Sequence, residues 1–367
     1  MKIALVVPGG VDRSGMHRVI PALLALIKRL ASGHELHVYA LQQENKPGEW
    51  ELCGAKIHNL GIGYTRLRAV RSICREHRVA PFDLTQSFFS GSCGLIAVSA
   101  ARFLGIPSVI HVAGSELVAL KSIAYGGRLS WKGRIREWLI LHAATAVTTP
   151  SAPMVAALAS LGIRAQRVPL SVDRDAWPCR LPLPRQKEGP ARLLHVGSLN
   201  RVKDQTTLLR AFALLIKSRS DVHLDIVGED TLHGEIQSQA IALHVADRVT
   251  FHGFLTQAGL RPVVEAAHLL VMTSRHEAGP VVVLEAAIVG VPTVGTAVGH
   301  IAEWAPEAAL AAEVGDAAGI AGLIDVLLRD EQLRLQLATE AQRRALQEDA
   351  DYTARRFEEI YATLGCS

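Results

Sequence analysis

Two glutamates flank a short apolar run in the segment RHEAGPVVVLEAA, residues 275–287. Glu277 precedes a Gly-Pro step and three valines, and Glu285 follows them eight positions after Glu277. The segment HLLVMT (268–273) predicts a strand, so Glu277 falls in the loop at its carboxyl end and Glu285 falls early in the next helix. We expect these two carboxylates to hold two parts of one small ligand. The simpler interpretation of the isolated pair is a solvated loop acid followed by an acid on a helix face.

The helix that follows Glu277 predicts a site for an anion. Proline is favoured at the first helical position because its missing N–H is not needed there, which suits Pro280. The N–H groups of a first helical turn lack intrahelical partners and attract phosphate or carboxylate. The residues at this turn are Gly279, Pro280, Val281 and Val282.

A lysine precedes a second predicted helix, in LLHVGSLNRVKDQTTLLRAFALL (193–215). Gly197 opens the turn after a strand, and Asp204 is typical of an N-cap. A cation at Lys203 is disfavoured by the helix dipole unless an anion lies between them, and phosphate is the usual anion. Arg201 could join that site. The alternative is a loop lysine exposed to solvent.

Two more glycine-containing turns stand between a predicted strand and a predicted helix. They are PGGVDRSG (8–15) and the start of GTAVGHIAEW (295–304), and both allow close approach of backbone to a ligand. Neither the dinucleotide fingerprint nor the Walker lysine pattern is present, which argues against an oxidoreductase and a P-loop enzyme.

Strand-like runs alternate with amphipathic segments in two series, which predicts an α/β protein with two doubly wound parallel sheets. The strand-like runs are 3–7, 35–40, 82–87, 107–112, 145–149, 191–196, 222–227, 248–253, 268–273 and 292–296. The Pro-rich stretch 177–190 predicts a linker. We therefore expect domains at 1–176 and 177–350 that face a central cleft, with a helix at 351–367 that packs back on the first domain.

The charge is uneven along the chain. Residues 1–178 carry 21 Lys and Arg against 11 Asp and Glu, whereas residues 179–367 carry 18 against 24. Five arginines in 66–78, and four basic residues with two tryptophans in 128–138, suggest a surface for anionic lipid headgroups. Solvated helix faces are the alternative, and no pattern typical of nucleic-acid binding is present.

The remaining composition indicates a cytoplasmic protein. No apolar run approaches the ~18–20 residues of a membrane span, and the N-terminal run is too short for a signal peptide. The five cysteines, at 53, 74, 93, 179 and 366, have no metal or redox spacing and are expected to be free thiols.

In order along the chain, these segments resemble the family-4 retaining glycosyltransferases of the GT-B fold. The likeness rests on VGSLNRVKDQTTLLRAF, DIVGED, DRVTFHGFL, TSRHEAGPVVVLEAAIVGVPTVGT and VGHIAEW in the second half. In the first half it rests on the glycine-rich turn, GHELHVYA, FDLTQS and GIPSVIHVAGSE. The resemblance implies two Rossmann-like domains, a nucleotide-sugar on the second and an acceptor on the first.

The resemblance also implies roles for individual residues. Lys203 matches the lysine that binds the diphosphate, Glu277 the acid that contacts the donor sugar, and Glu285 the acid that holds the ribose hydroxyls. The catalytic pair is thus Lys203 and Glu277. Other donor-site positions are Gly197, Ser198, Arg201, Gly253, Phe254, Gly279, Pro280, Val281, Val282, Gly299 and His300. The acceptor loops hold Gly10, Ser14, Gly15, His111, Ser115 and Glu116.

Two positions depart from the family pattern. Ser198 stands where many members carry an arginine, and Ala113 stands where many carry a histidine. His111 lies two residues earlier on the same side of the strand, where a packed strand histidine is the preferred interpretation. These departures put the contact to the sugar's 6-hydroxyl and the acceptor geometry in question, but not the donor site.

The resemblance implies transfer with retained configuration from a UDP- or GDP-linked sugar, as in polysaccharide biosynthesis at the cell envelope. We expect no metal and no cofactor, because Lys203 and helix amides replace a divalent ion at the leaving diphosphate. The acceptor is expected to be a lipid-linked or cell-surface glycan. Two alternatives stay open: a nucleotide-sugar epimerase or phosphorylase of the same architecture, and a non-catalytic nucleotide-sugar-binding protein.

Overall fold

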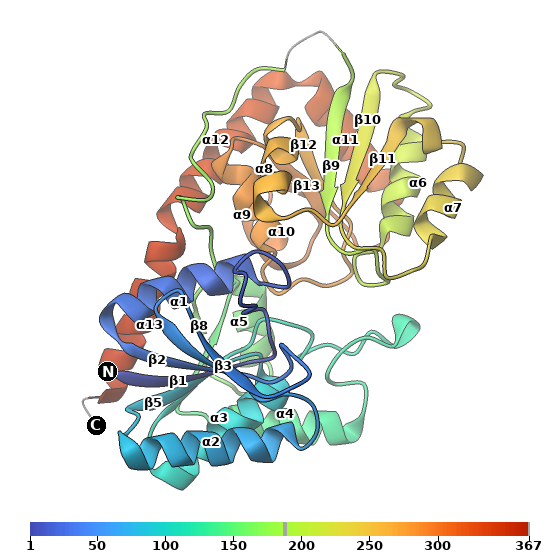
Figure 1. Ribbon diagram of the computed structural model, residues 1–367. Helices are drawn as coiled ribbons and strands as arrows, with labels where there is room; N and C mark the ends of the chain where they lie inside the picture. The colour runs from blue at the N-terminus through green and yellow to red at the C-terminus, as the bar shows by residue number, and fades with distance from the viewer. Residues whose placement is uncertain (186–188, 366–367) are drawn as a thin grey trace. The chain divides into compact units, whose positions relative to one another are not determined.

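A computed structural model describes residues 1–185 and 189–365, and the chain divides into two compact units. The first unit comprises Met1–Leu170 and resumes at Ala350, and the second is Ser171–Asp349. Each unit is built on a predominantly parallel sheet with flanking helices, which confirms the predicted doubly wound α/β fold (Figure 1).

The boundary between the units differs from the expected one after residue 176. Val172 and Trp177 are both buried in a core cluster of the second unit, so the chain has joined that unit before the Pro-rich stretch begins. Part of that stretch, residues 186–188, lies outside the described residues, as do Cys366 and Ser367.

The first unit holds an eight-stranded sheet in the order β3-β4-β2-β1-β5-β6-β7-β8. Only the β3–β4 pair is antiparallel. The strands are β1 (Lys2–Val7), β2 (Glu35–Ala40), β3 (Gly48–Leu52), β4 (Ala55–Asn59), β5 (Leu84–Phe88), β6 (Ser108–His111), β7 (Ala146–Thr149) and β8 (Gln166–Arg167). The helices are α1 (Pro21–Gly33), α2 (Thr65–Val79), η1 (Ser90–Gly94), α3 (Leu95–Leu104), η2 (Lys121–Ile123), α4 (Trp131–Ala143), α5 (Ala152–Ala159) and α13 (Ala350–Gly365).

The C-terminal helix α13 completes the first unit's core. Its apolar face, with Phe357, Ile360 and Tyr361, is buried with Leu26 of α1 and Leu5 of β1. Figure 1 shows α13 lying beside α1, although more than 300 residues separate them in the sequence. Arg29 and Asp351 add an ion pair between the two helices.

The hairpin of β3 and β4 was missed by sequence analysis. In β3 partly buried side chains alternate with exposed ones, in β4 buried side chains alternate with exposed or partly buried ones, and neither strand carries a continuous apolar run. Cys53 and Gly54 close it with φ values of 53° and 81°, which is the type I′ geometry that matches the twist of paired strands.

The second unit holds a six-stranded parallel sheet in the order β11-β10-β9-β12-β13-β14. The strands are β9 (Ala191–Val196), β10 (Val222–Val227), β11 (Val249–Gly253), β12 (Leu269–Met272), β13 (Thr293–Thr296) and β14 (Ala309–Ala312). The helices are α6 (Gln205–Leu215), α7 (Glu235–Ala242), η3 (Ala246–Arg248), α8 (Gln257–Glu265), α9 (Val281–Ile288), α10 (Gly299–Trp304), α11 (Ala317–Arg329) and α12 (Glu331–Gln347).

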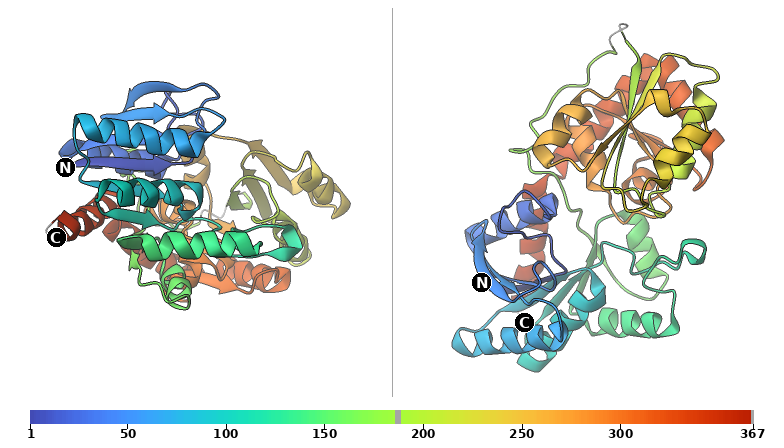
Figure 2. Two further views of the ribbon diagram at one scale, coloured as in Figure 1. Left: turned by 90° about the horizontal axis from the view of Figure 1, so that it is seen from below. Right: turned by 45° about the vertical axis from the view of Figure 1, so that its right-hand side comes forward.

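Both faces of this second sheet are buried. Leu193 of β9 packs in the cluster with α6, α7 and α11, whereas the next residue, Leu194, packs in the cluster with α8, α9 and α12. Figure 2 shows helices on the two sides of these strands. Strands buried on both faces form nearly continuous apolar runs, which is why β9 to β13 were evident in the sequence. The edge strand β14, with one fully buried residue, was missed by sequence analysis.

Candidate functional site

The candidate site lies where the strand order of the second unit reverses. Strands β10 and β11 follow one another on one side of β9, and the next strand, β12, pairs with β9 on its other side. Because β9 and β12 are parallel neighbours, the loops that follow them leave the same edge of the sheet. Ligands of open α/β sheets bind at this type of switch point.

Lys203 and Glu277 meet at this switch point, one from each loop. The Nζ of Lys203 lies 2.6 Å from Oε1 of Glu277, and the hydroxyl of Ser274 donates to the same oxygen at 2.6 Å. The side chains are 22% and 13% exposed, so the pair is partly desolvated yet open to a ligand. The structure thus brings together the two residues predicted to be catalytic.

Further contacts between the two loops hold this pair in place. Arg275 Nε lies 2.9 Å from Asp204 Oδ2, and Arg275 also donates its backbone N–H to the carbonyl of Val202. The Thr273 hydroxyl is 3.1 Å from the carbonyls of both Lys203 and Asp204. Asp204 is the N-cap of α6, as predicted, and accepts from Thr207. Lys203 is therefore fixed at its backbone on both sides.

Sequence reasoning missed the groups that support the pair. Ser274 stands three residues before Glu277, and that spacing was the available signal for their contact. Asn200 Oδ1 accepts the backbone N–H of Val202 at 3.1 Å, an Asx-turn contact that Asn in a loop makes often, and also that of Lys203 at 3.0 Å. Gln205 and His195 lie beneath, joined by a 3.1 Å hydrogen bond, and no local pattern marks them.

Burial keeps His195 neutral below the lysine. The side chain is fully buried, its Nδ1 lies 2.9 Å from the carbonyl of Val271, and desolvation lowers its pKa to about 4. A charged imidazole here would repel the Lys203 ammonium. Since it is neutral, the floor of the site does not compete with Lys203 for an anion.

Glu285 is a buried carboxyl group with little hydrogen bonding. It is 7% exposed, and its one described contact is Gln257 Nε2 at 3.5 Å. Desolvation raises its pKa to about 7. A buried carboxylate with unused lone pairs is costly, and a ligand hydroxyl that donated to it would lower that cost.

The third loop of the site, after β13, approaches closely because of a glycine. Gly299 has φ +52°, and a Cβ there would lie 2.9 Å from Pro280 Cδ and 3.1 Å from the Glu277 carbonyl. This glycine begins α10, which brings a second helix start next to α9. His300 follows and is fully buried, with Glu303 3.6 Å from its Nδ1.

The first turn of α9 has the predicted composition but a different boundary. Pro280 is the N-cap, with φ −69° and ψ 113°, and the helix begins at Val281 with Val282 beside it. Gly279 lies in the loop between Glu277 and this cap. The N–H groups of the first turn therefore start one residue later than expected.

Other predicted donor residues lie around this centre. A Cβ on Gly197 would touch the Lys203 stem at 3.2 Å, so the lysine lies across the glycine. Arg201 does not stand free, because both guanidinium nitrogens pair with Glu235 at 2.6 Å. Ser198 accepts from Gln205 through its carbonyl.

The positions expected to meet the base are exposed. Gly253 ends β11 with φ +67°, and Phe254 after it is 58% exposed. An exposed aromatic ring beside a flexible backbone position suits a planar ligand.

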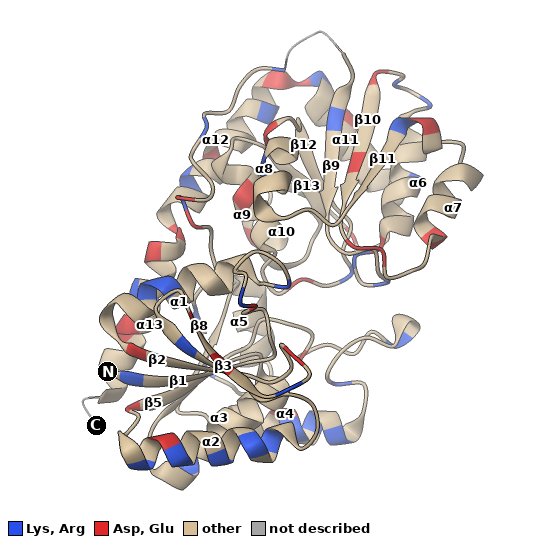
Figure 3. Ribbon diagram, in the orientation of Figure 1, with Lys and Arg blue, Asp and Glu red and all other residues tan. Residues whose placement is uncertain are grey.

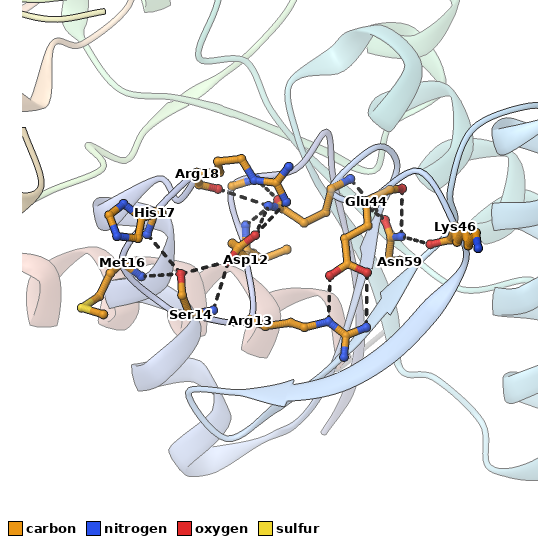
Figure 4. A network of polar contacts seen from close by, with 12 residues as sticks. Asp12, Arg13, Ser14, Met16, His17, Arg18, Glu44, Lys46 and Asn59 are labelled. Atoms are coloured by element: carbon orange, nitrogen blue, oxygen red, sulfur yellow. Dashed lines mark hydrogen bonds and ion pairs between the residues drawn. The ribbon is translucent and has the colours of Figure 1, made fainter. Parts of the chain in front are cut away.

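In the first unit the glycine-rich turn is held by a polar network (Figure 4). Gln43 accepts the N–H groups of Gly10 and Val11, and Asp12 accepts from Ser14. The Arg18 guanidinium beside Asp12 holds the pKa of that carboxyl well below its usual range. The turn, which includes Gly15 at φ +64°, is therefore fixed before any ligand binds.

A pocket of about 650 Å³ lies at the carboxyl ends of strands β1, β2 and β5. Its lining includes Pro8, Leu41 and Phe89 from the residues after these strands, with Arg66 and Ser92 joined by a 3.0 Å hydrogen bond. These strands meet at the switch point of the first sheet, where β5 lies on the opposite side of β1 from β2. Switch points of this type are where open α/β sheets bind ligands.

The remaining predicted acceptor residues lie beside β6. His111 is fully buried, packs against Phe88 and Phe357, and shares a 2.9 Å hydrogen bond with Thr148. Burial lowers the pKa of His111 to about 3. It is a core histidine with no surface on which to contact an acceptor.

The loop after β6 is organised by Glu116. Its carboxyl accepts the N–H groups of Ser90 at 3.0 Å and Gly114 at 2.7 Å, and burial raises its pKa to about 7. Ser115 accepts the N–H of Gly127 at 2.8 Å through its carbonyl. Glu116 is therefore a structural acid of this loop.

One group of side chains in the described part of the chain has the spacing of metal ligands: Glu35, His37 and Glu76. Lys2 Nζ lies 2.7 Å from Glu76 and 3.4 Å from Glu35, so its ammonium already supplies the positive charge these acids require. The group lies among β1, β2 and α2 of the first unit, whereas Lys203 and Glu277 belong to the second.

Comparisons with known proteins match this chain over both units. Residues 184–344 match the family described as glycosyl transferases group 1, and residues 14–173 match the glycosyl transferase 4-like domain. The second match contains the glycine-rich turn, and the first contains Lys203, Glu277 and Glu285. The chain belongs to the group 1 glycosyltransferases.

Solved structures show that this glycosyltransferase has the GT-B fold. It matches sucrose-phosphate synthase from Thermosynechococcus elongatus with a TM-score of 0.85 at 18% identity, over 99% of each chain. It matches Anabaena HepE in complex with UDP-glucose with a TM-score of 0.75 at 18% identity, over 99% of this chain and 100% of that chain. At these identities the likeness shows the fold alone.

Curated relatives are matched over part of their length. The chain is 32% identical to N-acetyl-alpha-D-glucosaminyl L-malate synthase of Bacillus anthracis over 151 residues, 41% of this chain and 39% of that enzyme. It is 27% identical to glycogen synthase of Mycobacterium tuberculosis over 262 residues, 70% of this chain and 62% of that enzyme. The matches thus span less than two thirds of these two relatives.

Replacement of Glu285 by Gln tests the burial of this carboxyl group. The pKa of Glu285 is about 7 in the folded protein and 4.5 in the unfolded chain, so the protonated carboxyl group favours the folded state. This stabilisation is fully present below pH 4.5 and is lost as the pH rises through 7. Between pH 5 and 8 the wild-type protein should lose about 2–3 kcal/mol more unfolding free energy than Glu285→Gln in urea titrations. The exposed Glu307→Gln is the control, and equal pH dependence of Glu285→Gln and wild type would contradict the assignment.

Proposed function

We propose that this protein is a retaining, hexosyltransferase-like glycosyltransferase that moves a sugar from a nucleotide-diphosphate sugar to a glycan acceptor. The observation that carries the proposal is the Lys203–Glu277 pair at the switch point of the second sheet. A lysine amine, a carboxylate and two helix starts converge there, which suits a ligand with a diphosphate and a hydroxylated ring. HepE, which shares the fold, is described in complex with UDP-glucose.

The diphosphate is the group that gains charge as the sugar leaves. The proposal assigns its neutralisation to Lys203 and the N–H groups at the starts of α9 and α10, without a divalent metal. On binding, the diphosphate would replace Glu277 as the ion-pair partner of the Lys203 ammonium. Glu277 is then released to accept hydrogen bonds from the sugar hydroxyls.

The nucleoside end is assigned to Glu285 and the Gly253–Phe254 turn. Glu285 lacks strong partners, and ribose hydroxyls would supply them. The exposed ring of Phe254 provides a surface for a base. UDP or GDP as the nucleotide remains the expectation from sequence.

Retention of configuration is proposed from the resemblance to the retaining family, with attack on the front face rather than through a covalent intermediate on an enzyme carboxylate. Glu277 shares one oxygen with Lys203 and Ser274 and is committed to hydrogen bonding. Attack by the acceptor on the face from which the diphosphate leaves requires no covalent carboxylate intermediate. The acceptor would dock in the first unit's pocket beside the glycine-rich turn.

A lipid-linked or cell-surface glycan is the proposed acceptor, reached at the inner face of the membrane. The supporting observation is α4, where Trp131, Ile135, Trp138 and Leu139 are each about half exposed or more. Their spacing places them on one helix face, and Lys132 and Arg134 are exposed beside them. Aromatic and basic residues together suit an anionic bilayer surface. Among the described residues, no helix combines the length and apolarity that crossing a bilayer requires.

Binding of the donor is tested by thermal shift with UDP-, GDP- and ADP-sugars. A ligand that binds the native state at ~100 times its Kd adds about 2.7 kcal/mol of stability and raises the Tm. We expect the largest shift with a UDP- or GDP-sugar, and a much smaller one for Lys203→Ala. The exposed Lys217→Ala should behave as wild type. If no nucleotide-sugar shifts the wild-type Tm, the proposed donor site is wrong.

Sugar transfer is tested with the same donor and an extract of membrane lipids and glycans. Lys203→Ala and Glu277→Ala should each lower transfer about 10²–10³-fold, because each removes a charge aimed at the reacting groups. Nuclear magnetic resonance of the product should show a new glycosidic bond with the donor's anomeric configuration. Full activity of either variant would refute the assigned roles, and an inverted product would refute the retaining mechanism.

Membrane association is tested by co-sedimentation with vesicles of phosphatidylglycerol and phosphatidylcholine at low salt. Replacement of Trp131 and Trp138 by Ser should lower the bound fraction about fivefold or more, because interfacial tryptophans supply apolar contact. Phe103→Ser removes an equally exposed aromatic ring from α3 and should have little effect. Absence of wild-type binding, or equal binding by all three proteins, would contradict the membrane proposal.

A further inference from the structure

A groove of about 780 Å³ runs along the first unit between helix α2 and the β3–β4 hairpin. It is a cavity of the size that holds small ligands. Its lining comes from residues 47–75 alone, so it belongs to the first unit, whereas Lys203 and Glu277 belong to the second. The function proposed above does not use it.

One wall of the groove is made by arginines of α2. Arg68, Arg71 and Arg75 follow one another at spacings of three and four, which places them on one helix face. The ribbon of Figure 3 shows α2 marked repeatedly in the blue of Lys and Arg. Arg68 donates to the carbonyl of Leu60, but Arg71 and Arg75 form no hydrogen bond or salt bridge within residues 1–185 and 189–365. Two guanidinium groups are therefore available to an anion.

The opposite wall is fixed by buried polar contacts. Asn59 donates to the carbonyls of Glu44 and Lys46 and accepts the N–H groups of Gln43 and Glu44, so it holds the segment that leads into β3 (Figure 4). Gly61 lies close behind this segment, and a Cβ there would meet Pro47 at 2.8 Å. The wall is preorganised, which lowers the entropic cost of binding.

His58 contacts Glu49, the one acidic residue in the lining of the groove, and so holds it against this wall. Its Nδ1 lies 2.8 Å from Glu49, its Nε2 lies 3.0 Å from His37, and its ring stacks on Tyr39 at 4.8 Å. Glu49 is thus engaged by an imidazole rather than by the arginines. The three arginines face one such acid in the lining, so the groove is positively charged.

Tyr64 and Leu67 form the end of the groove nearest the acceptor pocket and line both cavities. Tyr64 is 89% exposed, and Leu67 is 52% exposed. An exposed phenol ring stacks on the apolar face of a sugar ring and its hydroxyl bonds the sugar's hydroxyls. The charged groove therefore continues from the pocket at the carboxyl ends of β1 and β5.

The groove differs from the surface assigned to the membrane. The α4 surface presents two tryptophans and two aliphatic side chains outward. The α2 groove is concave, and its lining combines three arginines and other polar side chains with the apolar Pro47, Leu60 and Leu67. Guanidinium groups bind carboxylates and phosphates in bidentate geometry. A saccharide that carries carboxylate or phosphate groups can enter a concave, positively charged groove and contact the tyrosine at its end. A flat bilayer surface fits this shape less well.

We propose that the groove between α2 and the β3–β4 hairpin binds an anionic saccharide, through Arg71 and Arg75 with Tyr64 stacked on a neighbouring ring. The site would hold the part of the acceptor that extends beyond the sugar being modified. That assignment to the acceptor rests on the proposed transferase function, whereas binding of the saccharide itself does not.

The test is calorimetric titration of the full-length protein with trigalacturonic acid, with neutral maltotriose as the matched probe of equal length. Arg71→Ala/Arg75→Ala should weaken trigalacturonate binding about tenfold or more, because two charge-assisted contacts are removed. Arg78→Ala/Arg102→Ala removes the same charge from exposed positions outside the groove and should change the Kd by less than about twofold. Tyr64→Ala should weaken binding without a change in net charge. Thermal melts verify that every variant is folded.

Four outcomes would overturn the proposal. They are the absence of trigalacturonate binding by the wild type, equal affinity for maltotriose, an unchanged Kd in the groove variant, and an equal loss in the control variant. Binding of phosphatidylglycerol vesicles that depends on Arg71 and Arg75, without trigalacturonate binding, would assign the groove to a membrane instead.

The same titration separates this site from the donor site. Lys203→Ala should bind trigalacturonate as wild type does, since the groove lies wholly within the first unit. Groove binding in a protein that shows no donor binding would leave the saccharide site standing and refute the transferase function. Donor transfer without groove binding would refute the saccharide site alone.

Discussion

The ion pair between Lys203 and Glu277 is the interaction on which the second unit's site depends. The two residues are 74 positions apart, and they meet because β9 and β12 are parallel neighbours whose loops leave the same edge of the sheet. A lysine beside a helix start is unfavourable alone. The carboxylate of Glu277 offsets that repulsion in the free protein.

The residues around the pair fix its position, and the His195 imidazole beneath it adds no charge. Arg275 and Thr273 fasten the loop after β12 to the residues on either side of Lys203, and Gly299 lets a third loop approach the Glu277 backbone. His195 stays neutral because it is buried. The charge at the pair is consequently carried by the two partly exposed groups to which we assign the proposed diphosphate and sugar.

The first unit stabilises its acidic side chains in two ways. Glu116 is retained by backbone N–H groups and shapes the loop after β6, whereas Glu35 and Glu76 are neutralised by Lys2. Arg71 and Arg75 form no hydrogen bond or salt bridge with any residue that the structure describes. Since unpaired guanidinium groups on a fixed wall cost little in water, their availability is a property of the groove rather than a defect of the fold.

The sequence by itself determined the elements and the order of the chemical groups, because strand and helix periodicity, the Asp204 cap and the turn glycines act through near neighbours along the chain. Only the tertiary structure decided which distant groups meet. It paired Lys203 with Glu277, tied Arg201 to Glu235, buried His111 in the core and drew Trp177 into the second unit. It also formed the β3–β4 hairpin, whose weak apolar pattern gave no local signal, and with it the arginine-lined groove. Such pairings depend on strand order and side-chain packing, which no short stretch of sequence encodes.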